Sequence, residues 1–128
     1  MIRLWHHFQR LFLSQKSIGN VAWLWHRLTG IALALYLIPH FISIHSAMEG
    51  PNVFDETLAT YQSPFYAFCE WMLILTVAYH AANGLRIIAM DLFNLSSYQK
   101  WFFGFVIAIC LTVFILSSFL FVPRILKV

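Results

Sequence analysis

Three long apolar stretches dominate this sequence, at residues 20–46, 64–91 and 101–122, and short polar segments separate them. Each stretch has at least the ~20 residues that a helix needs to cross the hydrocarbon core of a membrane. Apolar side chains make up 61% of the 128 residues and charged ones only 10%, which is more apolar surface than a soluble domain of this size can bury. The sequence therefore predicts an all-α membrane protein, a single domain with three transmembrane helices.

The first sixteen residues have a different pattern, in which apolar and basic side chains alternate. On a helix, one face would carry the apolar side chains of Leu4, Trp5, Phe8, Leu11 and Phe12, largely opposite Arg3, His6, His7 and Arg10. This stretch lacks the continuous apolar run of a signal peptide. It predicts an amphipathic helix over residues 1–16 that lies at the membrane interface or against a partner subunit.

The cationic side chains indicate how the three helices are oriented. Six fall at one end of the predicted bundle (Arg3, Arg10, Lys16, Arg27, Arg86 and Lys100) and two at the other (Arg124 and Lys127). Because cytoplasmic ends carry the excess of Lys and Arg, the N-terminus is expected in the cytoplasm. The linker 48–64 contains turn residues and three acidic side chains but no cation, and it is expected on the outer side. The net charge of +3 gives no indication of a nucleic-acid partner.

Ionisable side chains within the predicted spans are rare in membrane proteins and commonly mark functional sites. The first span has His26, Arg27, His40 and His45, and the second has Glu70, His80 and Arg86. The third has none, which indicates a structural role. At ~100° per residue, the first helix places His26, Thr29, Leu33, Tyr36 and His40 on one stripe, with His45 turned ~140° away from His40.

His80 shares a helical face with Thr76 and Gly84 and is followed by two alanines. Small residues beside a histidine leave room for a large flat group, and haem fits because imidazole is a common axial ligand of its iron. Close packing of two helices through small residues would explain the same pattern.

The two central histidines lie at different predicted depths. His80 is eleven residues from Asp91, or ~16 Å, whereas His40 is seventeen residues from Trp23, or ~25 Å. This offset argues against both binding one iron. If both are ligands, there are two haems, and each takes its second histidine from a partner membrane subunit.

Two further ionisable residues have alternative explanations. Arg86 either neutralises haem propionates, together with Arg27 and His26, or extends to the interface and pairs with Asp91. Glu70, near the outer end of its span, is either a carboxylate on a proton path or a water-facing residue at a helix end.

Two segments resemble a known family. HRLTGIALALYLIPH (26–40) and YHAANGLRIIAMDL (79–92) resemble the larger membrane-anchor subunit, of cytochrome b type, of succinate dehydrogenases and fumarate reductases. The His-Arg-x-Ser/Thr-Gly start and the His-x3-Gly-Ile/Leu-Arg-x4-Asp segment are both features of that family. They occur here in order on consecutive spans, and the three-span topology agrees.

The resemblance implies roles for individual residues. His80 matches the axial haem b ligand of the second helix, and His40 matches the first-helix ligand of the branch with two haems and two anchor subunits. His26 and Arg27 match residues that border the quinone site and the haem propionates. Trp23 departs from the pattern, since single-haem relatives have a quinone-binding serine there. A kink at Pro39 would turn His45 inward, so His45 is the alternative to His40.

The implied protein is the membrane-anchor cytochrome b subunit of a succinate:quinone oxidoreductase in a bacterial inner membrane. It would pass electrons between an iron–sulfur subunit and membrane quinone (menaquinone or ubiquinone) through two haem b groups, each shared with a second membrane-anchor subunit. The flavoprotein and iron–sulfur subunits would dock on the cytoplasmic face, and this chain would form half of a haem-binding helical bundle. It would carry no dicarboxylate chemistry itself. Two alternatives remain: a haem-free anchor of a fumarate reductase, and a small proton-relaying transporter or channel subunit.

Overall fold

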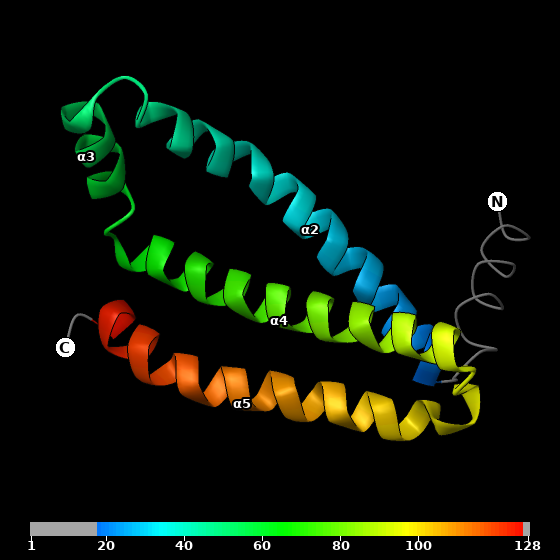
Figure 1. Ribbon diagram of the computed structural model, residues 1–128. Helices are drawn as coiled ribbons and strands as arrows, with labels where there is room; N and C mark the ends of the chain where they lie inside the picture. Colours follow the sequence, from blue (N-terminus) through cyan, green and yellow to red (C-terminus); the bar gives the residue numbers. More distant parts are fainter. Residues whose placement is uncertain (1–17, 127–128) are drawn as a thin grey trace, which may run out of the picture.

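The computed structural model describes residues 18–126, which form three long helices joined by short helical connections (Figure 1). The elements are α2 (Ile18–Ser46), α3 (Pro51–Thr60), α4 (Pro64–Phe93), the 3₁₀ turn η1 (Ser96–Tyr98) and α5 (Gln99–Leu126). Within the described part, three helices are long and apolar enough to cross a membrane, which confirms the predicted fold class. The amphipathic helix expected over residues 1–16 lies outside the described residues.

Helix α3 lies in the linker where the sequence indicated only turn residues. It begins at Pro51, directly after Gly50, whose φ of 121° is a backbone conformation that glycine adopts readily. Proline is favoured in the first turn of a helix because the N–H that it lacks would have no partner there. The same residue type opens α4 at Pro64, and Asn94 ends α4 in the left-handed conformation with φ 53°.

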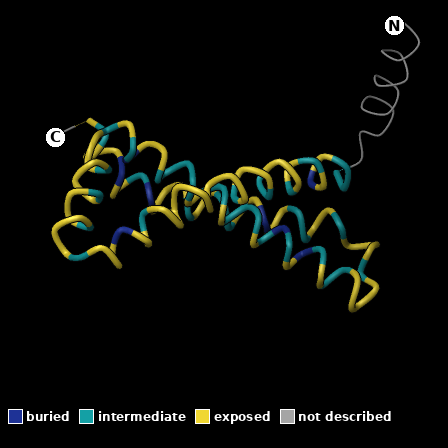
Figure 2. The backbone as a smooth tube through the Cα atoms, turned by 90° about the horizontal axis from the view of Figure 1, so that it is seen from above, coloured by how far each residue is buried: buried dark blue, intermediate teal, exposed yellow. Residues whose placement is uncertain are grey.

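The helices do not pack evenly. Helices α4 and α5 lie side by side along most of their length, whereas the first half of α2 contacts the second half of α4 and the two then diverge toward α3 (Figure 1). Buried positions are few among the described residues and lie where helices approach one another (Figure 2). In α2, only Ala22 and Ser46 are buried. Most large apolar side chains therefore face lipid or a partner chain.

The α4–α5 interface contains a short polar contact between two spanning helices. The indole N–H of Trp71 donates to Ser117 Oγ at 2.8 Å, and the Trp71 ring stacks on Phe114 with centroids 5.4 Å apart. At the same end, Arg124 pairs with Glu70 at 3.2 Å, with both side chains substantially exposed. Arg124, a cation at the predicted outer end, thus has an anionic partner.

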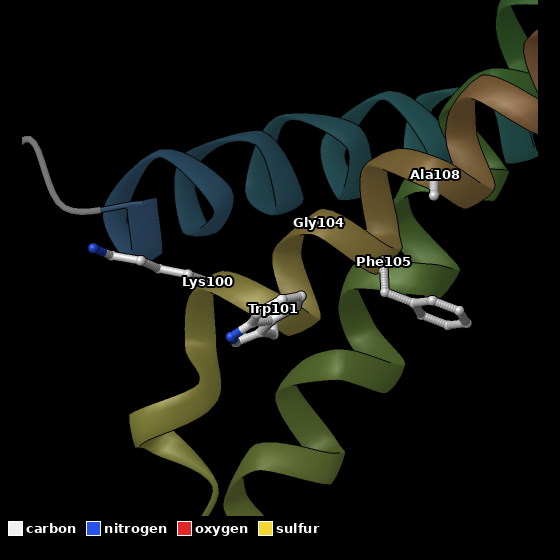
Figure 3. A pocket seen from close by; sticks show the side chains of 5 residues that line it. All are labelled: Lys100, Trp101, Gly104, Phe105 and Ala108. Carbon is white, nitrogen blue, oxygen red and sulfur yellow. The ribbon is translucent and has the colours of Figure 1, made fainter.

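The opposite side of α5 carries an open groove near the start of the helix. Figure 3 shows its lining residues, Lys100, Trp101, Gly104, Phe105 and Ala108. Trp101 is 82% exposed, and no atom comes within 4 Å of the position that a Cβ at Gly104 would occupy. None of the histidines in the described part of the chain borders this groove, so the candidate functional site lies elsewhere.

The Trp71–Ser117 contact is open to a direct test. Replacing Trp71 by Phe keeps the aromatic stack but removes the donor, and we expect the free energy of unfolding in detergent to fall by about 1 kcal/mol. The matched control is Trp101→Phe, at an exposed tryptophan on the same pair of helices, which should change stability by less than about 0.5 kcal/mol. Equal effects of the two substitutions would contradict the assigned interface.

Candidate functional site

Two histidines from different helices stack where α2 and α4 approach most closely. The rings of His26 and His80 are nearly parallel, with centroids 4.0 Å apart and planes inclined by 10°. Each ring also packs against a glycine of the opposite helix. A Cβ at Gly30 would lie 3.1 Å from His80 Cε1, and one at Gly84 would lie 3.4 Å from His26 Cε1. A side chain at Gly30 would therefore be tight against His80, whereas one at Gly84 would make an ordinary contact, and both explanations for Gly84 stay open.

Hydrogen bonds determine which nitrogen of His80 carries the proton. Its Nδ1 lies 3.1 Å from Thr29 Oγ1 and 3.2 Å from the carbonyl oxygen of His26. A carbonyl oxygen can only accept, so Nδ1 is assigned as the protonated nitrogen of the neutral ring. Nε2 then keeps its lone pair, and no hydrogen bond within residues 18–126 reaches it. A neutral imidazole in this state can act as a metal ligand through Nε2.

A buried polar network holds the same region together. The Tyr79 hydroxyl and the Asn83 side-chain amide both donate to the carbonyl of Ala22, at 3.1 and 3.4 Å, and so join α4 to the first turns of α2. Arg86 in turn donates to Asn83 Oδ1 at 3.0 Å. Sequence analysis assigned no role to Tyr79 or Asn83. Their spacing could have indicated a shared contact surface, because residues 79, 83 and 86 fall on one face of a helix.

Arg86 does not occupy the interfacial position considered from the sequence. Its side chain is buried, with 6% of its surface exposed, and its guanidinium lies over the ring of Phe103 at 5.7 Å. Asp91 is exposed, and no ion pair joins it to Arg86 in the described part of the chain. The alternative of an interfacial Arg86–Asp91 pair is therefore wrong. The physical reason is the Asn83 amide and the Phe103 ring, which draw the guanidinium inward.

Arg27 has the exposed position that Arg86 lacks. Its guanidinium lies 4.6 Å from the ring centre of Trp23, in cation–π geometry, and its side chain is exposed. It directly follows His26, whose Nδ1 is buried without a hydrogen-bond partner among the described residues. The His26–His80 stack thus contains one buried, unsatisfied ring nitrogen, Nδ1 of His26, and the exposed guanidinium of Arg27 belongs to the next residue of α2.

The remaining candidate residues lie at the other end of the molecule, around a cavity of about 430 Å³ between α2, α3 and α4. It is lined by Tyr36, Pro39, His40, Ser43, Ile44, Phe54, Leu58, Tyr61, Tyr66, Cys69, Glu70 and Leu73. His40 Nδ1 is 3.3 Å from the Tyr36 hydroxyl, and a 2.6 Å hydrogen bond between Ser43 and Tyr61 links α2 to the end of α3. Glu70 borders this cavity as well as pairing with Arg124, so both its explanations stay open.

His45 is absent from that lining. It is exposed and stacks on Phe41, with ring centroids 6.5 Å apart. Helix α2 stays α-helical through Pro39, so the turn after the proline is not rotated in the way that would bring His45 inward.

The two histidine positions are farther apart than the sequence indicated. His26 and His40 are fourteen residues apart on α2, or about 21 Å, and His80 lies level with His26. The sequence-based estimate of the difference in depth between His80 and His40, ~9 Å, was too small. It counted from Asp91 and from Trp23 as if these two residues lay at the same depth. The Ala22 carbonyl bonds Asn83, and α4 continues for about two turns beyond that level before it reaches Asp91. Two separate sites follow from this geometry.

Metal-binding side chains are few at both positions. The inner position has the imidazoles of His26 and His80, and the outer cavity has that of His40. No group of three or more histidine, cysteine, aspartate or glutamate side chains suited to a metal ion occurs within residues 18–126.

Comparison with known proteins places these features in one family. Residues 4–118 match the succinate dehydrogenase/fumarate reductase transmembrane subunit family. The chain is 30% identical to the succinate dehydrogenase 2 membrane subunit of Mycobacterium tuberculosis over 76 residues, 59% of this chain and 56% of that protein. It is 29% identical to the succinate dehydrogenase hydrophobic membrane anchor subunit of Halobacterium salinarum, and the aligned region covers 71% of this chain and 72% of the relative. The corresponding subunit of Archaeoglobus fulgidus is 32% identical, over 61% of this chain and 68% of its own length. The protein therefore belongs to the succinate dehydrogenase/fumarate reductase transmembrane subunit family and is a multi-pass membrane anchor.

Proposed function

We propose that this chain is the cytochrome b anchor subunit of a succinate:quinone oxidoreductase and carries electrons between an iron–sulfur subunit and membrane quinone. The observation that supports this most directly is the state of His80. Its Nδ1–H is bonded to α2, and its Nε2 lone pair has no partner within the described residues. A bonded Nδ1–H is the usual arrangement of a histidine that ligates a metal through Nε2.

The residues around His80 fit a haem b group. Haem supplies a one-electron carrier when bound, and its two propionates need cations or hydrogen-bond donors. Arg27 is an exposed guanidinium, which forms paired hydrogen bonds to carboxylates, and His26 offers an unsatisfied ring nitrogen. The same two side chains are our candidates for the quinone site, with menaquinone or ubiquinone as substrate.

His40 repeats the arrangement of His80 at the other end. In both cases a hydroxyl on α2, Thr29 or Tyr36, lies within hydrogen-bond distance of Nδ1. Because the two positions are about 21 Å apart along α2, each would bind its own haem. Each haem would take its second ligand from a second anchor subunit. The unpaired apolar surface of α2 leaves room for that partner, since only two of its residues are buried.

The distribution of cations supports an orientation with the His26–His80 end inside. Arg27, Arg86 and Lys100 lie toward that end, whereas Arg124 lies at the other end and is paired with Glu70. In a bacterial inner membrane, the N-terminus would then be cytoplasmic. The iron–sulfur and flavoprotein subunits would dock on this inner face, close to the haem held by His80.

One observation favours a second candidate, the haem-free anchor. The His26–His80 stack, with each ring seated on a glycine, is a well-packed helix contact without any cofactor. Family membership, by contrast, supports an anchor over a transporter or channel subunit. A reduced-minus-oxidised optical spectrum of the purified complex, with its haem-to-flavin ratio, separates the two anchors. A b-type band supports our proposal, and its absence supports the haem-free anchor.

Replacement of His80 by alanine tests the inner ligand. We expect the purified complex to lose one of its two haems, because no other described imidazole on α4 can replace the missing bond. Haem content per flavin is the measurement. Unchanged haem content and an unchanged spectrum in His80→Ala would show that His80 is no ligand.

A comparison of His40→Ala with His45→Ala tests the outer ligand. Only His40 borders the outer cavity, so we expect His40→Ala to contain one haem per complex and His45→Ala to contain two. Two haems in His40→Ala and one in His45→Ala would show that His45, and not His40, is the outer ligand. One haem in the unmutated complex would contradict the two-haem proposal.

Replacement of Arg27 by alanine tests the quinone site. A charged hydrogen bond contributes about 1.5–3 kcal/mol, so we expect succinate:quinone reductase activity to fall about tenfold or more. Electron transfer from succinate to a soluble artificial acceptor should change little, because it bypasses the membrane site. Arg124→Ala, at the other end of the bundle, is the control and should affect neither assay. Equal losses in both assays for Arg27→Ala would rule out a specific quinone role.

A further inference from the structure

We infer that Thr29 is a positioning residue for His80: its hydroxyl holds the imidazole in the tautomer and ring orientation that present Nε2 to iron. This inference rests on the proposed function, since it treats His80 as an axial ligand. It assigns to the threonine of the His-Arg-x-Thr-Gly segment a task distinct from the haem and quinone contacts of His26 and Arg27.

The direction of the Thr29–His80 hydrogen bond follows from the other contacts of the hydroxyl. Thr29 Oγ1 donates within α2, at 2.8 Å from the carbonyl of Trp25 and 2.9 Å from that of His26. A hydroxyl has one hydrogen and two acceptor lone pairs. Because that hydrogen is directed to the helix carbonyls, the oxygen faces His80 as an acceptor. The 3.1 Å contact is therefore donated by His80 Nδ1–H.

A second acceptor from the same turn of α2 requires the same tautomer. The carbonyl of His26 lies 3.2 Å from His80 Nδ1, and it has no hydrogen to give. With the proton on Nε2 instead, the lone pair of Nδ1 would face the His26 carbonyl oxygen and be repelled by it, and the Thr29 hydroxyl would have to give up its bonds to the helix carbonyls to donate to Nδ1. Thr29 and the His26 carbonyl together make the Nδ1–H form the one that fits.

The ring can reach these acceptors only because the next residue has no side chain. A Cβ at Gly30 would lie 3.1 Å from His80 Cε1, closer than ordinary van der Waals contact. On its other side the His80 ring is covered by His26, with centroids 4.0 Å apart. The hydrogen bonds at Nδ1 set the in-plane rotation of the ring, and these neighbours set its tilt.

A hydrogen bond accepted from Nδ1–H makes an imidazole a stronger electron donor through Nε2. Stronger donation stabilises ferric over ferrous iron, so acceptors that bond the Nδ1–H of the ligating histidine lower the reduction potential of a haem. Removal of the Thr29 acceptor should raise the potential of the haem that His80 ligates. The His26 carbonyl remains in place, so that haem should still be bound.

The experiment is a redox titration of the purified complex. It is monitored through the optical b-type band of the haem and by low-temperature electron paramagnetic resonance. Thr29→Val keeps the shape of the side chain but removes the acceptor, and Thr29→Ser keeps the hydroxyl. The control is Thr112→Val on α5, where the lost hydroxyl bonds the carbonyl of Ala108 within its own helix. In Thr29→Val we expect a higher reduction potential of the haem that His80 ligates and a shifted resonance spectrum. In Thr29→Ser and Thr112→Val we expect both to match those of the unmutated complex.

Thr29→Ala removes the same acceptor from a smaller side chain and provides a second variant should valine impair assembly. If haem is present and neither variant changes the potential or the spectrum, the role of Thr29 is overturned while the proposed function stands. An equal shift in Thr112→Val would also overturn it. A complex without any b-type band would instead overturn the proposed function, and this inference with it.

Discussion

The reciprocal contact between two imidazoles and two glycines determines how α2 and α4 meet. His26 lies over Gly84 and His80 over Gly30, so α2 and α4 approach closely at a single level. In a membrane such approaches depend on small residues, because lipid offers no hydrophobic drive for helices to associate. From this level the two helices diverge, and the space that opens becomes the outer cavity, closed by α3.

Polar groups make up half of the buried residues in the described part of the chain: Ser46, Asn83, Arg86 and Ser117, beside Ala22, Ala67, Val106 and Phe121. An unpaired polar group costs several kcal/mol in lipid, and each of these side chains makes at least one hydrogen bond to another side chain or to a carbonyl. The Nε atom of Arg86 has no partner among the described residues. The chain of contacts from Arg86 through Asn83 to the Ala22 carbonyl fixes α2 against α4 one turn before His26. The register of the histidine pair thus depends on these polar side chains as well as on the contact between the two rings.

The sequence predicted what depends on length and periodicity. The three spans follow from apolar length. The first-helix stripe correctly grouped His26 with Thr29, since both side chains contact His80, and Tyr36 with His40. Helix α3 was missed because Gly50 and Pro51, read as turn residues, also form a good helix start. The position of Arg86 could not be foreseen, since it depends on Phe103 of another helix. Haem, quinone and partner subunits involve molecules beyond this chain, so they stay proposals.

Helix α3 also acts as a spacer. It is ten residues long, about 15 Å, and the Ser43–Tyr61 hydrogen bond ties its far end back to α2. The gap between α2 and α4 at this end is therefore set by the length of a short connecting helix, whereas the inner end is set by two glycines. The two ends of the molecule are independently adjustable: an insertion or deletion in the connection would resize the outer cavity and leave the inner histidine pair unchanged.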